Sequence, residues 1–265
     1  MGEYLRARRE LTEPAAAGLS VVGVRRTPGL RREEVATLAG ISADYYLRLE
    51  QGRDRNPSPQ VLAALARVFR LDPAATEYLL SFAAARPAPA RRPRGEVPPS
   101  IRQLLDVLGL PAFVESRMFD VLAANRLATA LSPTIRPGLN RLRTMFLDEE
   151  ERHRYPDWER DIGAMVAAFR ASLGTDVADP RTARLVGELS LASEHFRQLW
   201  ARHDVQPLAG APARVSHPEL GVLDLYREKL PLADSDGLLL VIYHAEAGSA
   251  SAQALSRLGS LAATA

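Results

Sequence analysis

A proline-rich segment about a third of the way along the chain limits how the rest can fold. Residues 86–100, RPAPARRPRGEVPPS, hold five prolines and four arginines. Proline donates no backbone hydrogen bond and disfavours helical geometry in the residue before it, so this segment is predicted to be an extended, semi-rigid linker. The 265 residues then divide into an N-terminal domain at 1–85 and a C-terminal domain at 101–265, which suits the usual ~100–200 residues per domain.

Composition narrows the class of protein. Hydrophobic residues make up 46% of the chain and charged residues 25%, the mixture of an ordinary soluble globular protein. The chain has no cysteine, which excludes disulfides, thiolate metal centres and a cysteine nucleophile. Its first residues are charged, and its longest apolar run, 238–243, is far shorter than the ~20 residues of a membrane span. We therefore expect a cytoplasmic protein that does not enter a membrane.

The net charge of +2 conceals an asymmetry between the two ends of the chain. Residues 1–95 carry 16 arginines against 10 acidic residues, whereas the remainder carries 18 basic and 22 acidic residues. The basic end is where a polyanion such as DNA would bind. All but Lys229 of the 34 basic residues are arginine, so a nucleotide-composition bias of the source genome is an alternative explanation for the arginines.

The spacing of apolar residues predicts an all-α N-terminal domain. Ser58 is a suitable N-cap with Pro59 at the first helical position, and Asp72 precedes Pro73 in the same way. The stretch 12–29, rich in proline and glycine, is predicted to be a loop. The five predicted helices cover 4–11, 30–38, 42–49, a stretch that begins at 59, and 73–84.

The C-terminal domain is predicted to be α+β. Apolar segments at 112–114 and 119–123 predict short strands, and segments 222–230 and 237–245, joined by a polar turn, predict an antiparallel hairpin. Strands near both ends of the domain with helices between them indicate one antiparallel sheet with helices on a face. The predicted helices lie at 125–131, within 140–201, and at 251–262.

Gly40 separates two short helices with the spacing of a helix-turn-helix. Ala36 is small enough for the helices to touch, Gly40 suits the turn, and Tyr46 and Leu49 would hold the second helix against the first. An unrelated helical hairpin is the alternative. Positions downstream continue the pattern of the XRE/lambda-repressor-like family, which this region resembles; they are Glu50, Gly52, Pro57, Leu62, Leu65 and Ala66. The resemblance implies sequence-specific DNA binding.

In that docking mode the second helix enters the major groove with its N-terminal side chains toward the base edges. Arg48 is the best candidate for a contact to guanine, and Ala43 could touch a thymine methyl. Asp44 could accept from cytosine or simply stabilise the helix N-terminus. Ser42 is expected to cap the helix first and to contact DNA second, and Tyr45 could face either the core or the DNA.

Arginines around this helix are predicted to contact phosphates, which fixes the register of the protein on DNA without reading its sequence. Arg25 and Arg26, in the preceding loop, could enter a minor groove or remain solvated. The predicted phosphate contacts are Arg31 and Arg32, which open the first helix of the motif, and Arg53 and Arg55, which follow the second.

Five stretches spread over nearly the whole chain carry a wider likeness. They are GLRREEVATLAGISADYYLRLEQGR (29–53), FDVLAANRLATALSP (119–133), YPDWE (155–159), GELSLASEHFRQLWARHDV (187–205) and HPELG (217–221). In order and spacing they resemble XRE-type regulators that carry a MmyB-like ligand-binding domain. The resemblance implies a PAS-like sensor domain able to hold a fatty-acid-like molecule.

Large apolar side chains of this domain are available to line a pocket, although each of them could instead belong to the core. A pocket also needs a few convergent polar groups, for which Asn125, Arg143 and His203 are the candidates. The apolar candidates are Phe119, Met145, Phe146, Trp158, Phe169, Phe196, Trp200, Tyr226 and Tyr243.

The sequence offers no catalytic motif. It has neither a glycine-rich phosphate loop nor a GxSxG elbow, and its five histidines lack metal-ligand spacing. We therefore expect no enzyme activity, no metal, and no cofactor beyond a bound fatty acid or similar apolar ligand. The favoured interpretation is a homodimeric transcription regulator that binds a double-stranded DNA operator and responds to that small apolar ligand. The alternative is a protein-interaction module, such as an antitoxin or scaffold, without small-molecule sensing.

Overall fold

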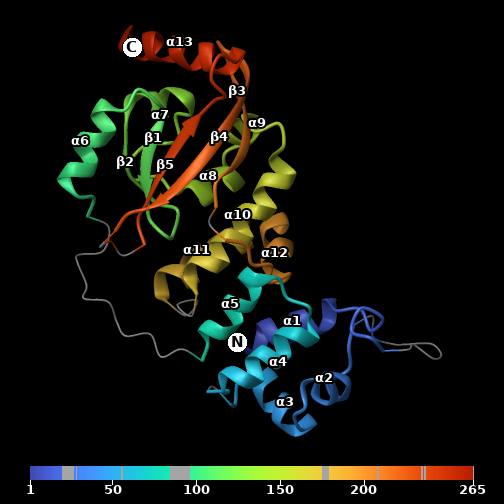
Figure 1. The fold of residues 1–265 in the computed structure, drawn as a ribbon. Helices are drawn as coiled ribbons and strands as arrows, with labels where there is room; N and C mark the ends of the chain where they lie inside the picture. The colour runs from blue at the N-terminus through green and yellow to red at the C-terminus, as the bar shows by residue number, and fades with distance from the viewer. Residues whose placement is uncertain are drawn as a thin grey trace.

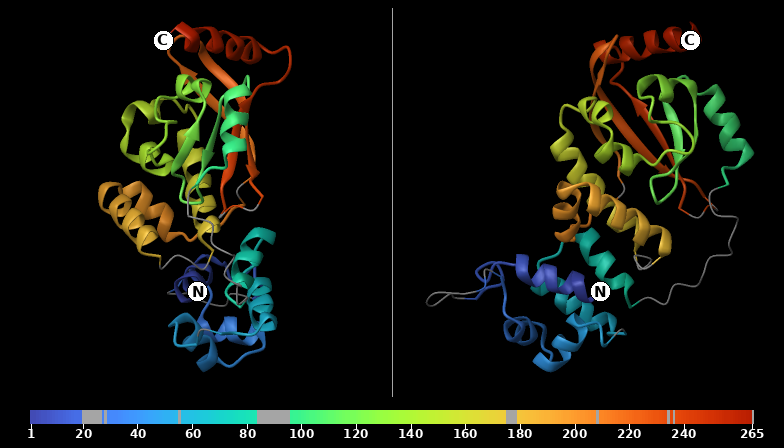
Figure 2. Two further views of the ribbon diagram at one scale, coloured as in Figure 1. Left: turned by 90° about the vertical axis from the view of Figure 1, so that its left-hand side faces the viewer. Right: turned by 180° about the vertical axis from the view of Figure 1, so that it is seen from behind.

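A computed structural model describes residues 1–19, 27, 29–54, 56–83, 96–174, 179–207, 209–233, 235 and 237–264. Helices α1–α5 gather at one end of the molecule and the β-sheet lies toward the other (Figure 1). Helices α10, α11 and α12 lie between the sheet and the N-terminal helices in both further views (Figure 2). Among the described helices, none has the length and apolar character needed to cross a membrane.

Five helices make up the described part of the N-terminal domain. The predicted caps are confirmed, because the side chain of Ser58 accepts from the amide of Val61 and that of Asp72 accepts from the amide of Ala75. Leu5, Tyr46 and other apolar side chains form one core among these helices. The helices are α1 (Gly2–Leu11), α2 (Arg32–Ala39), α3 (Ala43–Glu50), α4 (Pro59–Val68) and α5 (Pro73–Ser81).

The ends of the predicted linker differ from the prediction. Helix α5 ends at Ser81, and the predicted end at 84 lies outside the described residues, as do residues 85–95 of the boundary region. Helix α6 (Pro99–Val107) begins inside the segment 86–100. Proline is tolerated at the first helical position because that residue's amide has no partner within the helix, so Pro99 starts a helix rather than extending a linker.

The C-terminal domain holds one five-stranded sheet, with strand order β2-β1-β5-β4-β3 and antiparallel pairing between all neighbours. The predicted strands and hairpin are present, and the predicted fold class, an all-α domain followed by an α+β domain, is confirmed. Strand β3 was missing from the prediction. The strands are β1 (Ala112–Glu115), β2 (Val121–Ala124), β3 (Ala211–His217), β4 (Gly221–Pro231) and β5 (Leu239–His244).

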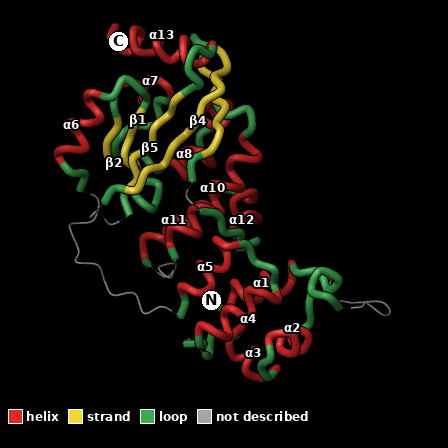
Figure 3. Tube along the Cα trace, in the orientation of Figure 1, coloured by secondary structure: helices red, strands yellow, loops and turns green. Residues whose placement is uncertain are grey.

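Helices cover the sheet unequally (Figure 3). Leu105 of α6 packs with Val114 and Leu240 on one face of the sheet. The opposite face, called the inner face here, packs through Val215, Leu223 and their neighbours against most of the remaining helices. The helices that supply this core are α7 (Arg126–Leu131), α8 (Arg141–Leu147), α10 (Trp158–Leu173), α12 (Glu194–Ala201) and α13 (Ala250–Thr264). The other two helices pack on neighbouring helices; they are α9 (Glu149–His153), beside α8, and α11 (Pro180–Ala192), beside α8 and α12.

Candidate DNA interface and candidate ligand cavity

The turn between α2 and α3 has the geometry that its sequence predicts. Gly40 ends α2 with φ of +68°, a left-handed conformation in which a Cβ would be strained. The amide of Ile41 donates to the carbonyl of Ala36 at 3.0 Å. Ala36 is buried where the two helices meet. The two helices therefore form a helix-turn-helix.

One side of α3 is fixed in the core and the other is exposed. Tyr46 and Leu49 are fully buried, as their spacing predicts. The hydroxyl oxygen of Ser42 accepts from the amide of Tyr45 at 3.1 Å, so Ser42 is the N-cap. The exposed side at the N-terminal end of α3, which we call the reading face, consists of Ser42, Ala43, Asp44 and Arg48, with Tyr45 half-buried at its edge.

Arg48 is oriented within the reading face by two neighbours. Its guanidinium forms an ion pair with the carboxylate of Asp44, one turn earlier. The guanidinium also lies over the ring of Tyr45, 5.7 Å from the ring centroid. Asp44 thus contacts the arginine predicted to read guanine, a role that the sequence prediction did not include.

The flanking arginines differ in how far their side chains are engaged. Arg31 and Arg53 are exposed. Arg32 pairs with Glu50 at 3.1 Å, and Arg9 of α1 pairs with the same carboxylate at 2.9 Å. Burial favours a raised pKa for Glu50, but the two guanidiniums hold that pKa below its usual range. Arg32 therefore stabilises the fold through Glu50 while its side chain remains exposed at the surface.

Three of the predicted DNA contacts cannot be placed on this surface. Arg25, Arg26 and Arg55 lie outside the described residues.

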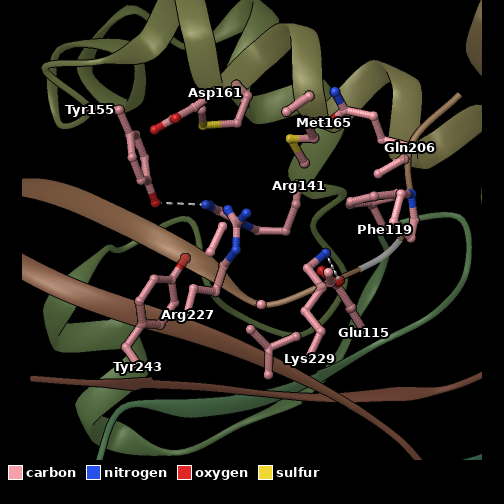
Figure 4. A pocket seen from close by; sticks show the side chains of 18 of the residues that line it. Glu115, Phe119, Arg141, Tyr155, Asp161, Met165, Gln206, Arg227, Lys229 and Tyr243 are labelled. Atoms are coloured by element: carbon pink, nitrogen blue, oxygen red, sulfur yellow. Dashed lines mark hydrogen bonds and ion pairs between the residues drawn. The ribbon is translucent and has the colours of Figure 1, made fainter. Parts of the chain in front are cut away.

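A cavity of about 220 Å³ lies between α10 and the inner face of the sheet (Figure 4). Strand alternation brings residues two apart onto one face, so Arg227 and Lys229 of β4 point into the cavity beside Val241 and Tyr243 of β5. Its walls are Phe113, Glu115, Phe119, Arg141, Met145, Tyr155, Asp161, Ala164, Met165, Ala168, Gln206, Pro207, Ala209, Gly210, Ala211, Arg227, Lys229, Val241 and Tyr243.

Lys229 is neutralised across the sheet. Its Nζ lies 2.6 Å from Oε1 of Glu115, which stands on β1 beyond the intervening β5, and both side chains are buried. The Nζ also lies 4.5 Å from the centroid of the Phe119 ring. Burial lowers the pKa of Lys229, and the Glu115 carboxylate opposes that shift. This cation already has a partner.

Arg141 is neutralised in the same way on the helical side. One of its terminal nitrogens lies 2.6 Å from Oε1 of Glu151, and the other donates to the Tyr155 hydroxyl at 2.8 Å. Burial alone would raise the pKa of Glu151, but Arg141 holds it below its usual range. Burial raises the pKa of Tyr155, so its hydroxyl stays protonated. The Ser132 hydroxyl completes the network by donating to Glu151 at 2.7 Å.

Arg227 differs from these two cations. Its Nε is buried and has no hydrogen-bond partner within the part of the chain that the structure describes. Figure 4 shows Arg227 beside Tyr243, between the strands and Arg141. An unpartnered guanidinium N–H in a buried position is costly unless a ligand supplies an acceptor. The cavity therefore offers one site for an anionic or strongly accepting group.

The structure places three of the predicted ligand residues, Phe119, Met145 and Tyr243, on the cavity wall. Five aromatic candidates instead pack together among the helices, with ring contacts that join them in pairs. They are Phe146, Trp158, Phe169, Phe196 and Trp200.

The remaining candidates also lie away from the cavity wall. Asn125 caps α7, accepting from Ala128 at 2.9 Å. Arg143 pairs with Glu188 on the surface. Tyr226 is 43% exposed on the other face of the sheet. His203 lies against α1, where its ring faces Tyr4.

The sequence prediction missed the charged wall of the cavity, although a signal was present. Lys229 is the one lysine among 34 basic residues. Arg227 and Lys229 also continue the period-two alternation that begins with Leu223 and Leu225, so both belong to the inner face of β4. Glu115 offers no such signal, because its partner is 114 residues away.

Comparison with protein families matches both halves of the chain. A helix-turn-helix domain family matches residues 1–79. The MmyB-like transcription regulator ligand binding domain family matches residues 97–258. No curated protein matches the chain. The exposed reading face and the cavity are features that a DNA-binding, ligand-binding regulator requires. The chain belongs to the family of MmyB-like transcription regulators and is a DNA-binding transcription regulator with a ligand-binding domain.

Proposed function

We propose that the ligand of this regulator is a long, apolar molecule with a single acid group, such as a fatty acid. The buried Nε of Arg227 in the cavity, which has no hydrogen-bond partner among the residues that the structure describes, carries the proposal. A carboxylate would supply the missing acceptor in a charge-assisted hydrogen bond.

The rest of the wall supports one acid group and an apolar tail. Met145, Met165 and Val241 present apolar surface to the cavity. Lys229 and Arg141 already pair with buried carboxylates. A ligand with a second acid group would have to break one of those pairs, which is strongly unfavourable for buried charges.

The protein acts, in this proposal, as a homodimer on a two-fold-symmetric operator in the cytoplasm. One helix-turn-helix covers few base pairs, and dimers of this motif place their half-sites roughly 34–36 Å apart. A protein that binds an operator must be in the same compartment as the DNA, which supports the cytoplasmic location.

Titration of palmitate into the full chain tests the ligand class. Saturable heat by calorimetry and a concentration-dependent rise in Tm are expected, because a ligand that binds the folded state stabilises it. Hexadecanol, which lacks the charge, should bind more weakly. Palmitate that gives neither heat nor a shift would eliminate this ligand class.

Two variants test whether Arg227 binds the acid group of the ligand. Arg227→Gln should weaken palmitate binding about 10- to 100-fold, the range expected for a hydrogen bond to a charged group. Arg214→Gln is the matched control, because Arg214 is half exposed on the neighbouring strand and pairs with Asp224 instead. Equal palmitate affinities for the two variants would contradict the role of Arg227.

A further inference from the structure

The two domains contact each other through α1 and the segment that follows α12. A terminal nitrogen of Arg8 donates to the carbonyls of Arg202 and His203 and pairs with Asp204 at 3.2 Å. Val205 is 5% exposed because it is packed in the core of the N-terminal domain. The segment 202–205, called the docking segment here, thus holds the DNA-binding domain by polar and apolar contacts together.

Helix α10 makes a second contact beside the first. Ala171 of α10 packs against the N-terminal core. Arg170 is buried, donates to the carbonyl of Trp200 at 2.6 Å, and lies 3.7 Å from the centroid of that indole ring. Burial lowers the pKa of Arg170, and Tyr78 of α5 opposes that shift. The DNA-binding domain therefore rests on both α10 and the docking segment, an arrangement also visible in Figure 2.

The same two elements form part of the cavity wall. Gln206 and Pro207 line the cavity and follow directly after Val205. In α10, Ala164 and Ala168 face the cavity, within two turns of Arg170. The amide of Gln206 donates to the carbonyl of Ala167 at 3.3 Å, which joins the two elements to each other. In this stretch a residue of the domain contact, Val205, and a residue of the cavity wall, Gln206, are direct neighbours in the chain.

We infer that occupancy of the cavity is transmitted to the DNA-binding domain by the docking segment and α10, and that a long ligand weakens the docking of α1. This rests on the proposed function for the kind of ligand, but the route follows from the contacts. The cavity volume of about 220 Å³ lies below the ~300–1,000 Å³ usual for ligand pockets. A long occupant that is fully enclosed must therefore displace part of the wall.

The displaced part is expected to be the stretch from Asp204 to Pro207. Those residues belong to no helix or strand, whereas the opposite wall is a hydrogen-bonded sheet. Movement there pulls directly on Arg8 and on Val205. A ligand alters operator binding when it favours one of the two arrangements over the other, and this displacement provides the difference.

The first experiment measures coupling in the full chain, with palmitate as the probe. Saturating palmitate should change operator affinity of the wild type at least about fivefold, the lower end of typical coupling between sites. Arg8→Ala and Asp204→Ala should retain palmitate binding and operator binding but lose most of that change. Arg6→Ala is the matched control, because Arg6 lies on the same helix and pairs with Glu10. Full coupling in all three variants would overturn the inference.

The second experiment needs no ligand. Ala164→Leu adds volume inside the cavity, whereas Ala183→Leu adds the same volume on the exposed side of α11. Amide hydrogen exchange in α1 and in the docking segment should become faster in Ala164→Leu and should stay unchanged in Ala183→Leu. Faster exchange confined to the cavity wall would overturn the inference.

The two experiments separate the two proposals. Failure of palmitate to bind, with faster exchange of α1 in Ala164→Leu, would remove the ligand class and keep the route. Palmitate binding with equal coupling in Arg6→Ala and Arg8→Ala would keep the ligand and remove the route.

Discussion

The carboxylate of Asp44 pairs with the guanidinium of Arg48 one helical turn later, on the exposed side of α3. An exposed pair within one helix contributes little to stability. Its effect is to orient Arg48 along the N-terminal half of the reading face before DNA is bound. Both residues are exposed, so a base edge can replace or extend the pair at small cost.

Arg48→Ala should weaken binding to a selected operator by about 1–3 kcal/mol and relax the preference at one base pair, because a bidentate base contact is lost while phosphate contacts remain. Arg31→Ala should weaken binding to all sequences alike. Competition assays over single-base operator variants measure both effects. Unchanged base preference in Arg48→Ala would show that another residue reads that position.

Operator affinity should fall steeply with salt, with a log-log slope of roughly −0.9 for each phosphate neutralised. Arg53→Ala should make this slope shallower by the contribution of about one phosphate, since Arg53 is exposed beyond α3. Affinity measured between 50 and 200 mM salt tests this. A helix-turn-helix used for protein interaction would show no such DNA binding at any salt concentration.

Glu50→Ala should destabilise the N-terminal domain by about 3–5 kcal/mol, because it leaves the buried guanidinium of Arg9 without its buried carboxylate partner. Glu10→Ala, at a half-exposed carboxylate that pairs with Arg6 at 3.0 Å and with Arg9 at 3.3 Å, should cost about 0–1 kcal/mol, because Glu50 still pairs with Arg9. Urea titrations followed by amide exchange in α3 measure both values. Equal losses would mean that the Arg9–Glu50–Arg32 cluster adds no more stability than the half-exposed pairs of Glu10.

The ion pair of Glu50 with Arg9 also predicts how the stability of the N-terminal domain depends on pH. The folded protein holds the pKa of Glu50 below its usual value, so the stabilisation is complete above that usual value and is lost as pH falls through the lowered one. The midpoint pH for acid unfolding of α3 should therefore shift in Glu50→Gln. No difference between that variant and the wild type at low pH would contradict this assignment.

Docking of the two domains should weaken in acid through His203. Burial, with Arg170, Arg8 and the N-terminal amine of Met1, lowers the pKa of His203 from 6.5 to about 3. Below pH 6.5 the undocked histidine binds a proton more readily than the docked one, so docking is weakened progressively from pH 6.5 down to about 3. Amide exchange in α1 across this pH range measures the weakening of docking. His203→Gln should remove the part of this weakening that the wild type shows above about pH 5. A profile that the variant leaves unchanged would contradict the role of His203.

The helix-turn-helix could be predicted because its signals are local. Gly40 stands at a turn that needs a left-handed residue, Ala36 lies four residues earlier on the contact face, and Ser58 and Asp72 cap the next helices. Each of these depends on residues within a few positions of one another. The same local periodicity predicted the hairpin of β4 and β5.

The cavity could not be predicted in this way. Trp158 and Met145 have similar apolar character, yet Met145 faces the cavity while Trp158 packs among helices and donates to the Met145 carbonyl at 3.0 Å. Which side each residue faces depends on how α8 and α10 cross the sheet. That arrangement is set by contacts between residues far apart in the chain.

Sequence by itself determined most of the helices and strands, the turn after α2 and the exposed side of α3, because helical and strand periodicity and capping act over a few residues. The tertiary structure decided the rest. Strand register brought Glu115 to Lys229 and left the Nε of Arg227 without a hydrogen-bond partner among the described residues. A shift of one residue in that register would turn every one of these side chains to the other face. The packing of α10 and α1 likewise placed His203 between the domains rather than in the cavity.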